Sequence, residues 1–154
     1  MKNKVVEKII EYCNNLNFSE VNSFLQEYEI FAIRSEVFAV EKSKAERVKE
    51  LISKYYLKII YLGKKIGRIG NKFFPNVAFF ELLFKYAKPE KIIELPYKKA
   101  WLFCCGRDLF LHKDGVFFLS YKGRFIGVAS YEKKRKIMKN LFDIGIYIRN
   151  QAKL

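Results

Sequence analysis

The first ninety residues alternate between stretches with helical and with strand-like spacing of apolar positions. Between residues 4 and 16 apolar side chains recur every three or four positions, which predicts an amphipathic helix. Two short β-type runs at 28–33 and 36–40 are separated only by Arg34 and Ser35. That arrangement predicts a β-hairpin.

Further along, Ser43 followed by Glu46 forms a capping box, which predicts a helix ending near Lys54. The runs 57–62 and 65–69 flank Gly63 and Lys64 and predict a second hairpin. A helix is predicted over 77–87, and its apolar positions cover most of its circumference, so we expect it to be buried.

The remaining residues have mostly strand-like spacing. We expect a strand at 91–95, a short apolar helix at 100–104 ending at Gly106, and a hairpin of 116–120 with 125–130. A strand or turn through Met138 and a final helical turn over 143–149 follow. Because strands dominate, this half predicts a small β-barrel.

The balance of basic and acidic residues also differs between the first ninety residues and the rest of the chain. Residues 1–90 carry 16 basic and 11 acidic side chains, whereas residues 91–154 carry 14 basic and 5 acidic ones. Pro89 follows a predicted helix and marks the seam. We therefore predict an α+β protein with an α/β domain at 1–90, built from an antiparallel sheet and helices, and a basic domain at 91–154.

Composition limits the cellular compartment in which the protein is expected. No apolar run approaches the roughly 18 residues of a membrane-spanning helix, and the N-terminus does not resemble a signal peptide, so a cytoplasmic protein is expected. The three cysteines fit no disulfide framework or metal spacing, and Cys104 and Cys105 are interpreted as small buried hydrophobes. The absence of Thr and the presence of only two Gln fit a heat-adapted or AT-rich organism.

Enzymatic interpretations find little support. His112 is the only histidine and is interpreted as a surface-loop residue. The glycines at 63, 67 and 70 lie in a predicted hairpin rather than a phosphate loop, and no two of the three aspartates are placed as a catalytic pair. We expect no catalysis, no cofactor and no bound metal.

Several motifs occur together in one order. They are Leu62-Gly63 with Gly67-Arg68, the segments 80–87 (FELLFKYA) and 101–108 (WLFCCGRD), and the tail 143–149 (DIGIYIR). In this set the chain resembles the archaeal and eukaryotic nuclear import protein seven family, which takes part in large-ribosomal-subunit biogenesis. The resemblance covers nearly all of the chain from Tyr28 onward.

That resemblance implies a pre-PUA α/β domain followed by a PUA β-barrel, RNA binding by the barrel, association with pre-ribosomal particles, and no catalysis. The sequence departs from the family in two places. The second domain is only about 60 residues long, and residues 109–115 replace the glycine-rich stretch that usually follows the short PUA helix.

A dense run of cations is the main candidate for RNA contact. Five of the seven positions from 133 to 139 are basic, namely Lys133, Lys134, Arg135, Lys136 and Lys139. Their mutual repulsion is relieved by a phosphate backbone. The alternative is a solvated loop that only aids solubility.

Other candidate contacts each have a structural alternative. Lys122 and Arg124 lie at a hairpin tip, either beside the 133–139 run or in solvent. Arg107 either contacts a phosphate or caps its helix, with Asp108 as a possible ion-pair partner. Arg149 and Lys153 fit the carbonyl end of the terminal helical turn. Among the aromatics, Trp101 is expected in the core, while Tyr121 and Tyr131 are the candidates for stacking on bases.

The leading hypothesis is a monomeric, non-catalytic RNA-binding protein of ribosome assembly. Its partners are rRNA or pre-rRNA, bound by residues 91–154, and ribosome-assembly proteins, bound by the less charged residues 1–90, with no membrane. Two alternatives stay open: an RNA-targeting accessory subunit of an RNA-modification enzyme, and a protein-interaction scaffold without RNA binding.

Overall fold

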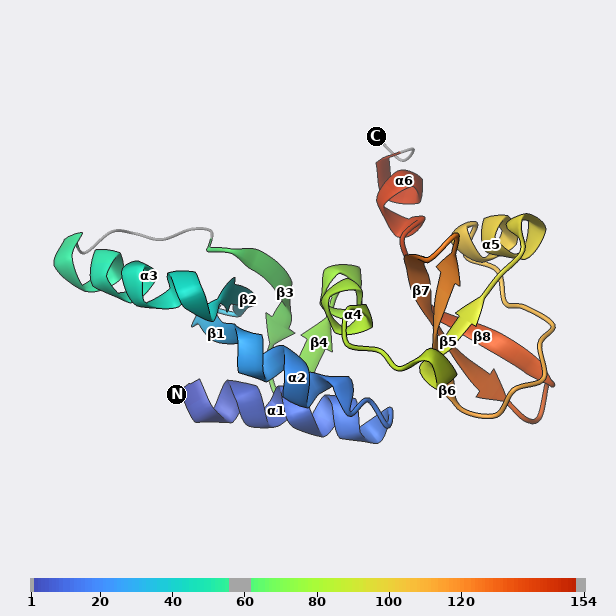
Figure 1. Cartoon of the computed structure of the whole chain (residues 1–154), viewed down its shortest axis with the longest axis horizontal. Helices are drawn as coiled ribbons and strands as arrows, with labels where there is room; N and C mark the ends of the chain where they lie inside the picture. Colours follow the sequence, from blue (N-terminus) through green and yellow to red (C-terminus); the bar gives the residue numbers. More distant parts are fainter. Residues whose placement is uncertain (1, 56–61, 152–154) are drawn as a thin grey trace. The chain divides into compact units, whose positions relative to one another are not determined.

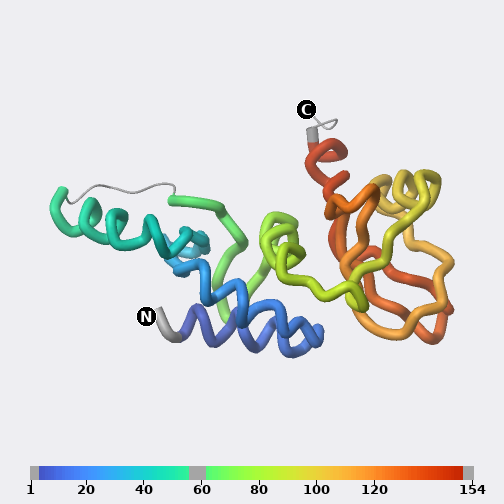
Figure 2. The backbone as a smooth tube through the Cα atoms, viewed as in Figure 1, coloured from blue at the N-terminus to red at the C-terminus, as the bar shows by residue number. Residues whose placement is uncertain are grey.

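The protein is described by a computed structural model that covers residues 2–55 and 62–151 (Figure 2). Within these residues the chain forms two four-stranded sheets and six α-helices (Figure 1). It divides into two compact units, Met1–Leu83 (unit 1) and Phe84–Leu154 (unit 2). The fold is therefore mixed α and β, as the sequence predicts.

Unit 1 begins with two helices, α1 (Lys2–Asn15) and α2 (Glu20–Glu27). The predicted hairpin forms β1 (Tyr28–Ile33) and β2 (Glu36–Glu41), and α3 (Lys42–Tyr55), β3 (Lys64–Ile69), β4 (Phe73–Pro75) and α4 (Val77–Phe84) follow. All strand pairs in the order β1-β2-β3-β4 are antiparallel. Sequence analysis missed α2 and β4.

The hairpin predicted from residues 57–62 and 65–69 is not confirmed. Residues 57–61 lie outside the described residues, and β3 pairs instead with β2 and β4. The helix predicted over 77–87 ends at Phe84, and six of its eight residues are buried, as expected. Aromatic rings of α2, β4 and α4 pack together, with Phe79 in edge contact with Phe24, Phe73 and Phe80.

Unit 2 contains a short 3₁₀ helix η1 (Pro89–Lys91), β5 (Ile92–Glu94), α5 (Tyr97–Cys104), β6 (Val116–Tyr121), β7 (Arg124–Glu132), β8 (Ile137–Asp143) and α6 (Ile146–Gln151). Strand β5 runs parallel to β6, while β6-β7-β8 are antiparallel. The predicted hairpin of β6 and β7 is confirmed.

The expected closed barrel is not found in the described residues. The sheet has the order β5-β6-β7-β8, with β5 and β8 at its two edges. Beyond β8 the loop after α5 adds a single bridge, in which Leu109 and Met138 exchange both backbone hydrogen bonds at 2.9 and 2.8 Å. Two bulges, in the β6–β7 and β7–β8 pairs, add local twist to this open sheet.

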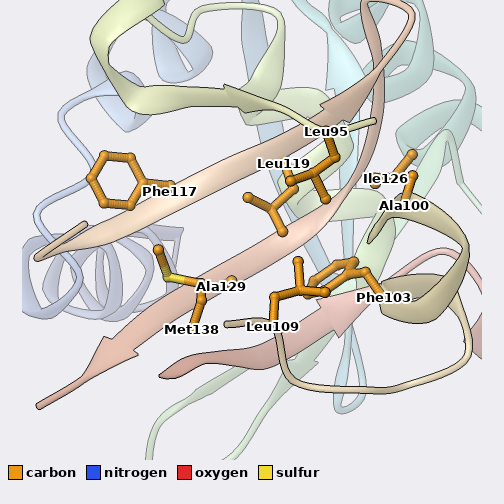
Figure 3. Packing of buried hydrophobic residues seen from close by; sticks show 9 residues of the cluster. All are labelled: Leu95, Ala100, Phe103, Leu109, Phe117, Leu119, Ile126, Ala129 and Met138. Atoms are coloured by element: carbon orange, nitrogen blue, oxygen red, sulfur yellow. The ribbon is translucent and has the colours of Figure 1, made fainter. Parts of the chain in front are cut away.

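The core of unit 2 lies between the sheet and α5 (Figure 3). Ala100 and Phe103 enter it from the helix, and the sheet and its edge loop contribute Leu95, Leu109, Phe117, Leu119, Ile126, Ala129 and Met138. A second aromatic contact involves Phe84, whose ring lies 5.9 Å from that of Phe118 and 5.5 Å from that of Phe125. No helix of the described chain has the length and apolar character needed to cross a bilayer.

Helix α5 ends in a Schellman motif. The Gly106 N–H donates to the Phe103 carbonyl at 2.9 Å, and the Arg107 N–H donates to the Leu102 carbonyl at 3.1 Å. Gly106 has a φ of 82°, which a residue without Cβ adopts at little cost. The prediction that this helix ends at Gly106 is thus confirmed.

The core assignment is testable with two phenylalanines that lie seven residues apart. Phe103 is 0% exposed, whereas Phe110 is 83% exposed. We expect Phe103→Ala to lower the free energy of unfolding of unit 2 by about 3–5 kcal/mol, and Phe110→Ala to change it by less than about 0.5 kcal/mol. Urea unfolding followed by fluorescence measures both, and equal effects would contradict the assignment.

Candidate nucleic-acid interface

Four consecutive cations form the turn between β7 and β8, here called the basic turn: Lys133, Lys134, Arg135 and Lys136. All four are exposed. Lys133 Nζ lies 3.1 Å from an Asp114 carboxylate oxygen, and Arg135 Nη1 lies 3.8 Å from Asp108 and 4.0 Å from Glu132. Within the described residues Lys134 and Lys136 have no ion-pair partner, which leaves their charges available to an anion.

Two more predicted cations border the basic turn. The bridge between Leu109 and Met138 places the loop that contains Arg107 beside β8, which contains Lys139. Asp108 accepts a hydrogen bond from the Asn140 N–H at 2.9 Å and faces Arg135, so its carboxylate is not the partner of Arg107. Arg107 and Lys139 are exposed and form no ion pair with any described residue.

Lys122 and Arg124 belong to the opposite end of β7. This strand has nine residues, so at a rise of about 3.3 Å per residue the two turns lie roughly 26 Å apart. Of the two arrangements left open by the sequence, the one beside the basic turn is wrong. Unit 2 therefore has two separate positive regions.

The β6–β7 turn has an unusual residue at its tip. Lys122 and Gly123 both adopt left-handed conformations, with φ of 48° and 72°. Two consecutive positive φ angles define a type I′ turn, for which Asn-Gly is the common sequence. A lysine at the first position stores backbone strain of about 1 kcal/mol.

Glu94 of β5 holds this turn in place. Its carboxylate accepts a hydrogen bond from the Ser120 hydroxyl and a longer one, 3.4 Å, from the Gly123 N–H. The Ser120 hydrogen bond is the main reason that the pKa of Glu94 lies below its ordinary value, because hydrogen bonds to a carboxylate favour its charged form.

Aromatic rings lie next to the same turn. The Tyr97 and Tyr121 ring centroids are 6.2 Å apart, and Lys122 Nζ lies 5.5 Å from the Tyr121 ring. Trp101 is one helical turn from Tyr97 and shares its side of α5. Tyr97, Trp101 and Tyr121 are called the aromatic patch.

The expectation that Trp101 belongs to the core is wrong, because its side chain is 61% exposed. Ala100 and Phe103 set the helix phase by facing the core, which turns Trp101 and Leu102 outward. Tyr121 and Tyr131, the candidates for stacking, are half-buried, and the Tyr131 hydroxyl lies 3.1 Å from Nδ1 of His112. His112 itself is exposed in a loop, as predicted.

Arg149 has an internal partner. Its guanidinium donates to both carboxylate oxygens of Asp143, at 2.8 and 3.0 Å, and a third hydrogen bond goes to the Cys104 carbonyl at the end of α5. Asp143 is only 5% exposed, and this pairing raises the pKa of Arg149. The carbonyl that Arg149 contacts belongs to α5 rather than to its own helix. Lys153 lies outside the described residues.

The three cysteines lie in different environments. Cys13 is buried, and burial raises its thiol pKa to about 12. Cys104 is half-buried, whereas Cys105 is exposed at the end of α5, so the expectation of a buried adjacent pair is wrong. No group of three His, Cys, Asp or Glu side chains in the described chain is arranged to hold a metal ion.

Comparisons with known proteins add no relative to this picture: no protein-family model and no curated protein matches the sequence. The functional argument therefore depends on the residues and their geometry.

The anchoring role of Glu94 predicts a defined pH response. Because its pKa is lowered in the folded protein, its stabilising contribution is complete above the ordinary value of 4.5 and disappears as the pH falls through the lowered value. In an NMR pH titration the Gly123 amide shift should follow a midpoint below 4.5, and Glu94→Gln should abolish that step. A midpoint at or above 4.5 would contradict the anchor.

Proposed function

We propose that this protein is a non-catalytic RNA-binding protein and that unit 2 binds the RNA. The observation that carries the proposal is the aromatic patch beside Lys122 and Arg124, because single-stranded nucleic acids are bound by rings that stack on bases and cations that neutralise phosphates. The basic turn provides a second contact for the backbone.

Charge supports a polyanionic partner. Lys134, Lys136, Arg107 and Lys139 form no ion pair with any described residue, and unit 2 contains the more basic residues 91–154. Releasing the counterions of bound phosphates provides the driving force for such binding and makes it salt-dependent. The roughly 26 Å between the two positive regions suits a strand that runs along unit 2 rather than one isolated phosphate.

We extend the proposal to a role in large-ribosomal-subunit assembly and to a pre-PUA and PUA arrangement of the two units. Support comes from the motif order of the sequence and from the division of the chain into two compact units, the second of which is built mainly of strands. Under this proposal unit 1 binds assembly proteins, and α3, which buries only Ala45 and exposes Leu51 and Tyr55, provides a suitable surface.

Salt dependence tests the electrostatic part. The variant Lys134→Gln/Lys136→Gln/Lys139→Gln should bind a single-stranded RNA more weakly. It should also reduce the slope of log affinity against log salt by up to about 2, because each phosphate contact to a single strand contributes about 0.7. Fluorescence anisotropy across a salt series measures both quantities.

The matched control is Lys42→Gln/Lys44→Gln/Lys54→Gln on α3, which removes the same charge from unit 1. It should leave the slope nearly unchanged. If the two triple variants lose RNA affinity equally, the binding depends on net charge rather than on a site in unit 2. If the unmodified protein does not bind RNA at moderate salt, the proposal is overturned.

The strained turn gives a test that separates binding from folding. Lys122→Asn creates the preferred Asn-Gly sequence of a type I′ turn, so it should stabilise unit 2 by about 0.5–1 kcal/mol. The same change removes a cation beside Tyr121 and should weaken RNA binding severalfold. Thermal unfolding and anisotropy on one sample measure the two effects, and a variant that is more stable and binds RNA equally well would exclude Lys122 from the interface.

A further inference from the structure

A hollow lies at one end of the sheet of unit 1, far along the sequence from the residues proposed to bind RNA in unit 2. The Ile69 N–H donates to the Ser35 carbonyl at 2.8 Å, so the β1–β2 turn lies against the end of β3. The hollow has a volume of about 370 Å³ and is lined by Ser35, Arg68, Ile69, Gly70 and Phe74. This volume is within the range of about 300–1,000 Å³ typical of small-molecule sites.

An exposed aromatic ring forms one wall. Phe74 is 50% exposed although it belongs to β4, and Lys72 Nζ lies 5.4 Å from its ring centroid. A Cβ placed on Gly70 would lie 3.7 Å from the Phe74 ring, so the missing side chain of this glycine leaves that side of the ring open. An open ring next to a cation has the chemistry that stacks on an unpaired base.

Positive charge surrounds the hollow. Glu36 lies opposite Arg68 in the strand register but pairs with Lys65, and in the described chain Arg68 has no acidic partner. Lys8 of α1 reaches the turn between β3 and β4, where its Nζ donates a hydrogen bond to the Gly70 carbonyl at 2.7 Å. Arg34, next to Ser35, is exposed and adopts a left-handed conformation with a φ of 55°. An anionic ligand is therefore favoured here.

We propose that this hollow binds one unstacked nucleotide of a single-stranded RNA, with the base against Phe74 and a phosphate against Arg68. The planar guanidinium of arginine makes paired hydrogen bonds to phosphate oxygens, and the ring accepts any base without sequence preference. This site belongs to unit 1 and stands whether or not unit 2 binds RNA.

The test uses the full chain carrying Lys122→Asn together with Lys134→Gln, Lys136→Gln and Lys139→Gln, which weakens the contacts proposed for unit 2. In that background Phe74→Ala and Arg68→Gln should each reduce the affinity for a labelled oligouridine at least fivefold. Phe74→Trp, which keeps a stacking surface, should retain the affinity. Arg47→Gln, at an exposed arginine of α3 without an ion pair in the described chain, is the matched control and should change nothing.

A photo-crosslink locates the contact directly. Oligouridine containing 5-iodouridine should crosslink to Phe74, as peptide mass spectrometry would show. Unchanged affinity in both Phe74→Ala and Arg68→Gln, or crosslinks confined to unit 2, would overturn the proposal. In the unmodified chain, crosslinks at Phe74 with none at the aromatic patch would support the proposal and overturn the function proposed for unit 2.

The experiment also distinguishes an RNA ligand of the hollow from an acidic protein segment. A labelled polyglutamate peptide serves as the second probe. If the peptide binds in a manner that depends on Arg68 and Phe74 while oligouridine does not bind, the hollow belongs to a protein partner and the proposal is wrong.

Discussion

Acidic side chains are scarce in this protein, and their positions decide which cations remain available to a partner. There are 30 basic and 16 acidic residues. On β3, Lys64 and Lys65 are neutralised by Glu81 and Glu36. Among the described residues, the cations without such partners include Lys134 and Lys136, in a hairpin turn. The β6–β7 turn lies roughly 26 Å from the basic turn, farther than the Debye length of about 10 Å, so the repulsion between these two turns is screened.

A single ion pair organises the end of unit 2. Because Arg149 binds the buried Asp143 and the Cys104 carbonyl together, it ties α6 to β8 and to the end of α5. Asn140 continues the network by donating to the Phe103 carbonyl and to Asp143. A Cβ on Gly145 would collide with the Cys104 carbonyl, so this close approach requires glycine. Removing the guanidinium would leave a buried carboxylate without its charged partner, and the penalty is reduced because Arg149 is partly exposed and Asn140 still donates to Asp143.

Local patterns predicted the local structure well. Both central hairpins, β1–β2 and β6–β7, were found from alternating apolar residues and from their turns, since these signals act over a few residues. The parallel pairing of β5 with β6 and the open edge of the sheet depend on long-range contacts, which leave no local pattern. Trp101 was wrongly predicted to be buried because the eight-residue α5 has apolar residues on several sides (Tyr97, Ala100, Trp101 and Phe103), so its sequence does not show which side faces the core. The hollow beside Phe74 could not be predicted because it forms where two turns from distant parts of the sequence come together.

Hairpin turns in both units share the same kind of backbone strain. Four non-glycine residues in the described chain have positive φ, and three of them, Arg34, Lys122 and Lys136, are basic residues in hairpin turns. Glycine, asparagine or aspartate would satisfy these conformations at lower cost. Folding alone therefore favours replacing each of them, and repulsion among so many cations favours it further. The anion binding that we propose would account for a long cation at the tip of each turn, because its binding energy would offset a strain of about 1 kcal/mol at each position. The same reasoning applies in unit 1 at Arg34 and in unit 2 at Lys122, although the two turns share no sequence motif.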